Sequence, residues 1–184
     1  CTVYGQADKL PVTEDAPFKQ AECPYGNTKQ INEEIIRDTC AIAKNIKAIS
    51  LRYFNPIGAH ASALIGELPN GVPQNLIPYI TQTAIGLRES LSVYGDDYPT
   101  PDGTCIRDYI HVVDLAEAHL AALEYILQGK IQDNYEVFNV GTGKGSSVLE
   151  VIKAFEKVTG QALPYKIVGR RAGDVVAAYA DTHK

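Results

Sequence analysis

The sequence predicts an α/β fold built on a parallel sheet. Short apolar runs that indicate buried strands alternate with stretches of helical periodicity, and glycine and proline cluster between them. Of the 184 residues, 45% are hydrophobic, which is enough for a substantial core. The alternation continues along the whole sequence without an internal repeat, so one α/β unit, or most of one, is expected.

The first helix is expected over residues 24–46. This stretch begins with proline, lacks glycine after Gly26 and repeats isoleucine at helical spacing. Residues 48–53 form an apolar run closed by Asn-Pro, which is typical of a buried strand. Before them, residues 2–5 are expected to be a strand that runs into a turn.

The later elements continue the alternation. Ser147 and Glu150 have the spacing of a capping box, in which each side chain bonds a backbone amide at the start of a helix. The stretch 55–72 is rich in Gly, Pro and Asn and indicates a loop. Helices are expected over 73–87, 112–128 and 147–159, and strands over 91–94, 135–140 and 165–168.

Composition excludes several classes of function. The net charge of -5 is not gathered into a basic stripe, so nucleic-acid binding is not expected. No run of about 18 apolar residues and no charged-then-apolar leader occurs, so we expect a cytoplasmic protein that does not enter a membrane. The four cysteines have no metal-ligand spacing, so we expect free thiols and no metal site.

The ends of the sequence suggest a fragment. The chain contains no methionine and opens directly on an expected strand, and it closes at Lys184 without a polar, flexible tail. We therefore expect both boundaries to be arbitrary cuts in a longer protein.

A glycine cluster at residues 141–147 follows an expected strand and opens an expected helix. That setting is typical of a phosphate-binding loop. The spacing, however, is GxGxG and not GxGxxG, and residues 160–168 offer no acidic side chain for a ribose. We predict a structural turn here and not a dinucleotide-binding loop.

Tyr25 and Lys29 lie four residues apart near the start of the first helix, so both side chains emerge on one face. A phenol with the ordinary pKa near 10 needs ~4 kcal/mol of preferential stabilisation of its phenolate to act as a base near neutrality. A close cation supplies part of this stabilisation. Taken alone, the pair is more typical of a solvated helix surface.

The wider sequence resembles the extended short-chain dehydrogenases that act on nucleotide sugars, and within them the UDP-galactose 4-epimerase branch. The resemblance covers the whole chain and rests on the order and separation of six segments. They are TVYG (2–5), PYGNTK (24–29), LRYFNPIGAH (51–60), QNL (74–76), DGTCIRDYIHVVDL (102–115) and GRRAGD (169–174).

The resemblance implies a Rossmann-like parallel sheet, incomplete here, and a smaller carboxy-terminal substrate-binding region. Residues 1–54 would be the distal part of the NAD-binding domain. Residues 55–184 would mostly bind the UDP-sugar, with 107–140 returning to the Rossmann sheet.

The resemblance also assigns NAD as cofactor and Tyr25 and Lys29 as catalytic and cofactor-binding residues. Tyr53 and Phe54 would pass the nicotinamide, although core packing is an alternative for both and equally weighted for Phe54. The family's catalytic hydroxyl would lie just before Cys1, so Thr2 has at most a substrate contact.

A UDP-sugar needs cations for its diphosphate, amides for its sugar and a flat apolar slot for uracil. Arginine suits the first task because its guanidinium fork matches phosphate oxygens. The alternatives are local ion pairs of Arg107 with Asp108 and of Arg171 with Asp174. By resemblance, Arg107 and Arg171 contact the diphosphate, Asn55 and Asn75 the sugar-nucleotide, Leu76, Ser92, Val93 and Tyr94 the uracil region, and Asp174 the ribose.

Ala178 occupies a position where some family members have a bulky tyrosine in the sugar pocket. A small side chain leaves room for a 2-acetamido group, because such a pocket discriminates by exclusion. We therefore hypothesise that UDP-GlcNAc and UDP-GalNAc are also accepted, unless the adjacent Tyr179 turns in.

The expected function is reversible 4-epimerisation of UDP-glucose and UDP-galactose by transient oxidation at C4, with tightly held NAD, in a homodimer. One alternative is a sister enzyme, a dehydratase or a decarboxylase. Another is a non-catalytic fragment that binds nucleotide sugars. The isolated chain is expected to be inactive and poorly folded.

Overall fold

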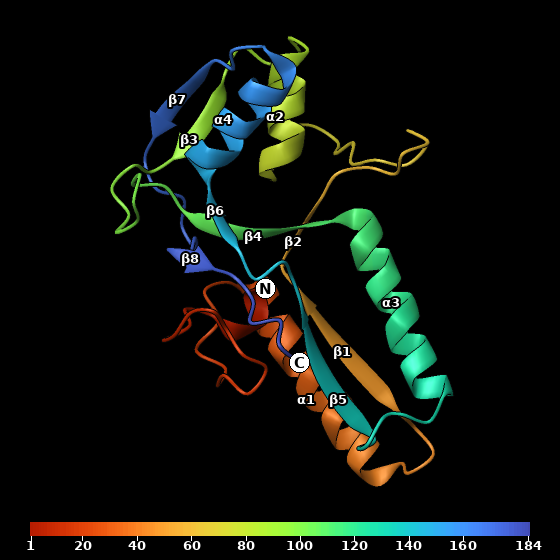
Figure 1. The fold of residues 1–184 in the computed structure, drawn as a ribbon. Helices are drawn as coiled ribbons and strands as arrows, with labels where there is room; N and C mark the ends of the chain where they lie inside the picture. The colour runs from red at the N-terminus through yellow and green to blue at the C-terminus, as the bar shows by residue number, and fades with distance from the viewer.

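The computed structural model describes residues 1–184, and strands and helices alternate along them as predicted (Figure 1). Most strand pairs are parallel, which confirms the α/β class. The elements are a 3₁₀ turn η1 (Thr2–Tyr4), helices α1 (Pro24–Ile42), α2 (Leu76–Ala84), α3 (Val112–Leu127) and α4 (Val148–Thr159), and strands β1 (Ala48–Tyr53), β2 (Asn55–Ile57), β3 (Leu91–Tyr94), β4 (Ile106–His111), β5 (Tyr135–Val140), β6 (Gly145–Ser147), β7 (Tyr165–Val168) and β8 (Ala177–Ala178).

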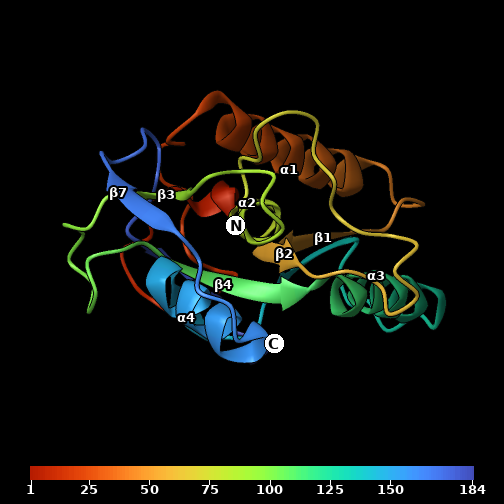
Figure 2. The ribbon, with the colours of Figure 1, turned by 90° about the horizontal axis from the view of Figure 1, so that it is seen from above.

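One end of the molecule is the parallel pair β1 and β5, with α1 and α3 on opposite faces (Figures 1 and 2). Successive side chains of a strand point to opposite faces, and β1 follows this rule. Arg52 forms an ion pair with Glu33 of α1, whereas the ring of Tyr53 lies against that of His119 in α3. This layered arrangement is where the resemblance places the Rossmann-like part of the chain, and we call it the Rossmann-like unit.

The opposite end is a second layered unit, in which the parallel pair β3 and β7 is covered by α2 and α4 (Figure 1). Its core holds Ile80, Leu91, Val93, Ile152 and Leu163, all buried. Helix α4 begins with the predicted capping box, since Ser147 accepts the amide of Glu150 and the Glu150 carboxylate accepts that of Ser147.

Between the two ends lies a short sheet centred on β4, which pairs with β2 and β8 in parallel and with β6 antiparallel. Within the segment 107–140, β5 pairs with β1, whereas β4 belongs to this middle sheet. The division into residues 1–54 and 55–184 remains a prediction.

Several element boundaries differ from the sequence expectation. The strand expected at residues 2–5 is instead the 3₁₀ turn η1. The neighbouring side chains of Val3 and Tyr4 are both buried. In a strand with one buried face, neighbouring side chains point to opposite faces and only one of the two would be buried. The first helix ends at Ile42 and the second begins only at Leu76. Strands β2, β4, β6 and β8 were not predicted.

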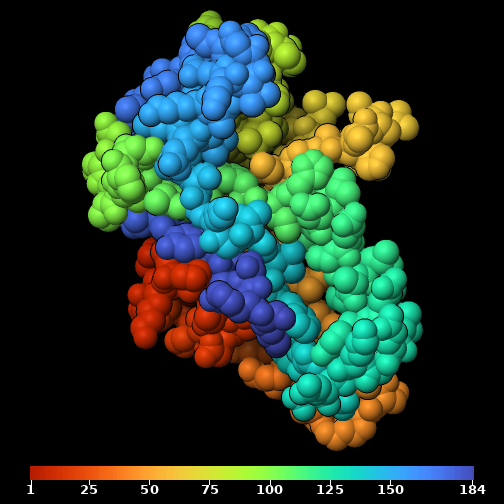
Figure 3. Space-filling view, viewed as in Figure 1, coloured from red at the N-terminus to blue at the C-terminus, as the bar shows by residue number.

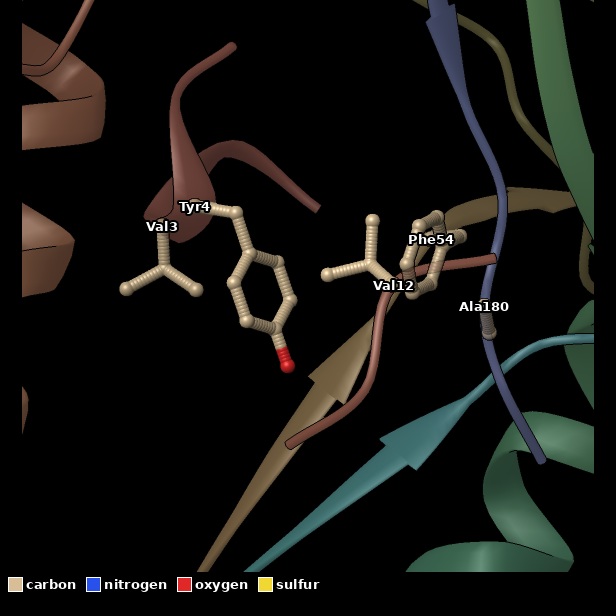
Figure 4. Packing of buried hydrophobic residues seen from close by; sticks show 5 residues of the cluster. All are labelled: Val3, Tyr4, Val12, Phe54 and Ala180. Atoms are coloured by element: carbon tan, nitrogen blue, oxygen red, sulfur yellow. The ribbon is translucent and has the colours of Figure 1, made fainter. Parts of the chain in front are cut away.

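A small hydrophobic cluster ties the amino-terminal residues to the rest of the chain. It consists of Val3, Tyr4, Val12, Phe54 and Ala180, which come from four separate segments (Figure 4). We call it the amino-terminal cluster. Because segments so distant in sequence meet there, it fixes the position of the first 20 residues.

Arg52 adds a polar clamp beside this cluster. Its guanidinium lies 4.8 Å from the ring centroid of Tyr4 and 4.9 Å from that of Phe18. It donates to Glu33 at 2.7 Å, to the Tyr4 hydroxyl at 2.9 Å and to the backbone carbonyl of Glu14 at 2.9 Å. A buried guanidinium with these partners has the charge and hydrogen bonds that it needs.

The carboxylate of Asp108, which is fully buried, occupies the glycine turn at 141–143. It accepts the amides of Thr142 at 2.8 Å, Gly143 at 3.1 Å and Ala180 at 3.1 Å, and the Thr142 hydroxyl at 2.6 Å. A Cβ at Gly141 would clash with this carboxylate. The turn is therefore structural, as predicted, because its amides already bind an anion from the protein itself.

None of the helices combines the length and the apolar character that crossing a bilayer requires.

We expect Asp108→Asn to lower the free energy of unfolding by about 3 kcal/mol, because the amide nitrogen faces backbone donors and leaves them without an acceptor. Urea denaturation followed by circular dichroism measures the change. Asp133→Asn, at an exposed position, is the control and should stay within about 0.5 kcal/mol. Equal effects of the two substitutions would contradict the role of Asp108.

Candidate functional site

A cavity of about 420 Å³ lies where the middle sheet meets the unit of β3 and α2. Its walls come from β2, β3 and β4, from the start of α2, and from the loops around residues 65–67 and 171–174. Eight side chains that the sequence assigned to substrate binding line it: Asn55, Asn75, Leu76, Ser92, Tyr94, Arg107, Arg171 and Asp174.

The cationic side of the cavity is formed by two arginines that share one carboxylate. Arg171 binds Asp174 through two nitrogens, at 2.8 and 3.1 Å, and Arg107 reaches the same carboxylate at 3.4 Å. The hydrogen bond with Asp174 raises the pKa of Arg171 above its usual value. The alternative pairing of Arg107 with Asp108 is wrong, because the two side chains lie on opposite faces of β4.

The apolar side of the cavity is formed by the start of α2 and by β3. Leu76 and Tyr94 line it, and the Arg171 guanidinium lies 5.6 Å from the Tyr94 ring centroid. The side chain of Val93 is buried in the core between β3, α2 and α4, so it does not contribute to the cavity wall. A ligand in the cavity could contact Val93 only through the backbone of that residue.

Glu67 and Tyr109 are cavity residues that the sequence reasoning missed. Glu67 accepts the side-chain amide of Asn75 at 2.6 Å and so fixes the orientation of that amide. Tyr109 could have been found from Arg107, since residues two apart in a strand share a face. Glu67 lies in the projecting loop between β2 and α2, where no periodic pattern places a side chain (Figure 3).

Tyr25 and Lys29 lie together on the first turns of α1, as predicted, but outside this cavity. The Lys29 ammonium is 5.0 Å from the Tyr25 ring centroid, and Tyr25 is 57% exposed. Thr2 is close by, since a Cβ at Gly26 would lie 3.3 Å from the Thr2 carbonyl oxygen. This geometry brings a phenol, an ammonium and the η1 turn to one open surface.

The two aromatic residues at the end of β1 have different environments. Tyr53 is 41% exposed, and its ring centroid lies 6.4 Å from that of His119. Phe54 is buried in the amino-terminal cluster, so its side chain follows the core-packing alternative (Figure 4). A cofactor contact therefore remains a prediction for Tyr53, whereas for Phe54 it could come only from the backbone.

Ala178 lies in β8, directly opposite Arg107 in the strand register. Its side chain is half-buried and packs against the amino-terminal cluster, so it lies beside the cavity wall without being part of the lining. That the small side chain of Ala178 leaves room for a 2-acetamido group on the sugar remains a prediction.

Residues 1–141 match the model of the NAD dependent epimerase/dehydratase family, which is more than half of the chain. The chain belongs to this family. A curated UDP-glucose 4-epimerase of Drosophila melanogaster is 54% identical over 180 residues, which cover 98% of this chain and 51% of that protein. The chain thus spans about half the length of the curated relatives it matches.

Solved structures agree with this assignment. A UDP-glucose 4-epimerase from Bifidobacterium longum in complex with NAD+ and UDP is 50% identical, with a TM-score of 0.94 over 100% of this chain and 53% of that one. A UDP-glucose-4-epimerase from Stenotrophomonas maltophila with bound NAD and formylated UDP-arabinopyranose is 51% identical, with a TM-score of 0.92, over 98% and 52%. The Rossmann-like fold is therefore shown by both sequence and structure.

Tyr109 gives the cavity wall a measurable pH dependence. Burial raises the pKa of Tyr109 to about 12, against the opposing effect of Arg107. The pKa of Tyr109 in the folded protein lies above the ordinary value near 10. The neutral phenol therefore contributes its full stabilisation of the fold below pH ~10, and this contribution is lost as the pH rises through ~12. We expect the free energy of unfolding to fall more steeply over this range in the wild type than in Tyr109→Phe.

Urea denaturation at several pH values between about 9 and 12 measures the difference. Tyr165→Phe, which removes a phenol that is 45% exposed on β7, is the control and should follow the wild type. Parallel curves for the wild type and Tyr109→Phe would contradict the assignment.

Proposed function

We propose that this chain is the sugar-nucleotide-binding half of an NAD-dependent UDP-glucose 4-epimerase, which interconverts UDP-glucose and UDP-galactose. One observation carries the proposal. The guanidinium groups of Arg107 and Arg171 lie side by side on Asp174, in a cavity that is also lined by the apolar side chains of α2 and β3. That combination suits a nucleoside diphosphate, and the closely similar Bifidobacterium longum enzyme was crystallised with NAD+ and UDP.

Different residues of the cavity would bind different parts of a UDP-hexose. Arg107 and Arg171 would hold the diphosphate, because guanidinium forks bind phosphate oxygens in a fixed geometry. Asn75, oriented by Glu67, and Asn55 at the start of β2 would bind the sugar-nucleotide. Leu76 and Tyr94 would form the uracil slot.

The exposed surface at Tyr25 and Lys29 would fit a nicotinamide and its ribose, because it offers a phenol and a cation. The ring of Tyr53 lies against α3, so a cofactor contact by Tyr53 is a separate part of the proposal. The glycine turn at 141–143 does not fit the cofactor's phosphates, since Asp108 already fills it. A bound NAD would supply reversible hydride transfer at C4 of the sugar. Lys29 would hold the nicotinamide ribose and favour the phenolate of Tyr25.

Tyr25 would act as the general base. Its phenolate takes the proton of the sugar 4-hydroxyl as the C4 hydride leaves, and the resulting phenol gives the proton back when the ketone is reduced. The diphosphate and uridine contacts hold the nucleotide while the hexose turns over. Return of the hydride to the opposite face would invert the configuration at C4.

The proposal extends to the assembly of the protein. Helix α1 exposes Ile35 at 59% and Ile42 at 85%, and such an apolar surface favours association of two copies through α1. We propose a cytoplasmic homodimer that binds UDP-hexoses.

For the chain by itself, a second candidate function is nucleotide-sugar binding without catalysis. The observation that favours it is the location of the cavity, whose lining lies entirely within residues 55–174 and does not include Tyr25 or Lys29. Binding of UDP by the 184-residue chain, without epimerase activity in the presence of NAD, distinguishes it from a complete enzyme.

We expect Tyr25→Phe, in a full-length protein that contains this chain, to lower kcat roughly 10²–10⁴-fold, because the general base is lost. The KM for UDP-glucose should stay nearly unchanged, since Tyr25 lies outside the cavity. A coupled assay of UDP-galactose conversion measures both constants. Tyr165→Phe is the matched control, and a Tyr25→Phe enzyme with more than half of the wild-type kcat would refute the proposed base.

The size of residue 178 should set the acceptance of N-acetylated sugars. We expect the wild-type protein to convert UDP-GlcNAc, and Ala178→Tyr to lose that activity while it keeps UDP-glucose activity. Ala178→Ser is the control for a small side chain. Wild-type turnover of UDP-GlcNAc on the order of 10³-fold slower than that of UDP-glucose would rule out this hypothesis.

A further inference from the structure

The two guanidinium groups of the cavity share one carboxylate before any ligand arrives. Asp174 accepts two hydrogen bonds from Arg171, through Nε and Nη2, and one from Arg107, through Nη2. The side chains of Arg107 and Asp174 are only 15% and 12% exposed. At these two partly buried positions water and salt screen the attraction poorly, whereas the side chain of Arg171 is 44% exposed. The shared carboxylate therefore competes with a ligand for the donors, through low exposure at Arg107 and through short bonds at Arg171.

The remaining contacts hold both arginines in place. Arg107 donates to the carbonyl of Ile106 at 2.8 Å, and Arg171 to the carbonyl of Gln74 at 3.3 Å. Neither guanidinium therefore depends on Asp174 alone for its position. Asp174 therefore affects the positive charge that a ligand meets more than it affects the positions of the two guanidinium groups.

The charges that line the cavity balance. Arg107 and Arg171 are opposed by Asp174 and Glu67, and Glu67 is already engaged by Asn75. A simple phosphate or diphosphate thus meets a cavity with no net formal charge, in which Asp174 occupies Nη2 of Arg107 and the Nε and Nη2 donors of Arg171. To bind through these donors, it must displace a carboxylate and leave that carboxylate buried without donors, which is costly.

We infer that Asp174 is a specificity-determining residue that excludes inorganic anions from the cavity. A ligand binds when its diphosphate accepts the hydrogen bonds of the two guanidinium groups. Hydroxyl groups of the same ligand then donate to Asp174 in place of the arginines. The ligand class that satisfies both demands is a nucleoside diphosphate with free ribose hydroxyls. The inference rests on the proposed function and adds to it a reason why free pyrophosphate does not block the site.

The test measures the affinities of pyrophosphate and UDP for the full-length protein, saturated with NAD so that the cofactor site is filled. Isothermal titration calorimetry is performed on the wild type and on Asp174→Asn. The substitution should tighten pyrophosphate binding about tenfold, because the guanidinium groups lose their competing charge. It should weaken UDP binding or leave it unchanged, so that selectivity for UDP over pyrophosphate falls.

Asp97→Asn is the matched control. Asp97 pairs with Arg170 at 2.7 Å, outside the cavity lining, so this variant removes the same charge from a neighbouring ion pair. Its pyrophosphate affinity should equal that of the wild type. Equal tightening in both variants, or none in Asp174→Asn while the wild type binds UDP, would overturn the inference. Failure of the wild type to bind UDP would instead overturn the proposed function.

Two further measurements do not depend on the folding of Asp174→Asn. Asp174→Glu keeps the charge and should keep pyrophosphate binding as weak as in the wild type. In the unsubstituted protein, the ¹⁵N resonance of Arg171 Nε should shift on saturation with UDP, because Nε leaves its bond to Asp174, while that of Arg170 stays fixed. An unchanged Arg171 resonance at saturating UDP would also contradict the inference.

Discussion

The buried carboxylate of Asp108 is the interaction on which the arrangement of the molecule depends. It binds the turn that follows β5 and the backbone of Ala180, and it does so from the middle of β4. Two residues of the same strand, Arg107 and Tyr109, point the other way into the cavity. Because one face of β4 anchors the Rossmann-like unit and the other face lines the site, Asp108 fixes the cavity relative to β5.

The sequence predicted those elements whose side chains follow a simple period. The strands at 48–53, 91–94, 135–140 and 165–168 have the predicted bounds, as their apolar runs are short and closed by turns. Strand β4 was missed because it places Arg107 and Asp108 side by side in a half-buried strand, a pattern that resembles a polar loop. Its strand character comes from tertiary partners, which no local pattern encodes.

The site was predictable where residue chemistry is specific and unpredictable where side-chain direction decides. Charged and amide side chains are seldom buried without a partner, so the sequence singles them out as candidates, and Arg107, Asn55 and Asp174 do line the cavity. Arg52 and Asp108 are buried in structural roles instead. Val93 and Phe54 are apolar, so their segments alone could not tell a ligand contact from core packing. Glu67 lies in an irregular loop, and only the folded chain brings it to Asn75.

The two halves of the proposed chemistry are prepared to different degrees. The cavity has fixed cations, an oriented amide and an apolar wall, so it is organised before a ligand binds. Tyr25, by contrast, is 57% exposed, with Lys29 over its ring. A phenolate is most effective as a base when water is excluded, so Tyr25 requires the cofactor and the sugar themselves to cover it. The nucleotide held in the cavity provides the binding energy that brings the hexose onto this open surface.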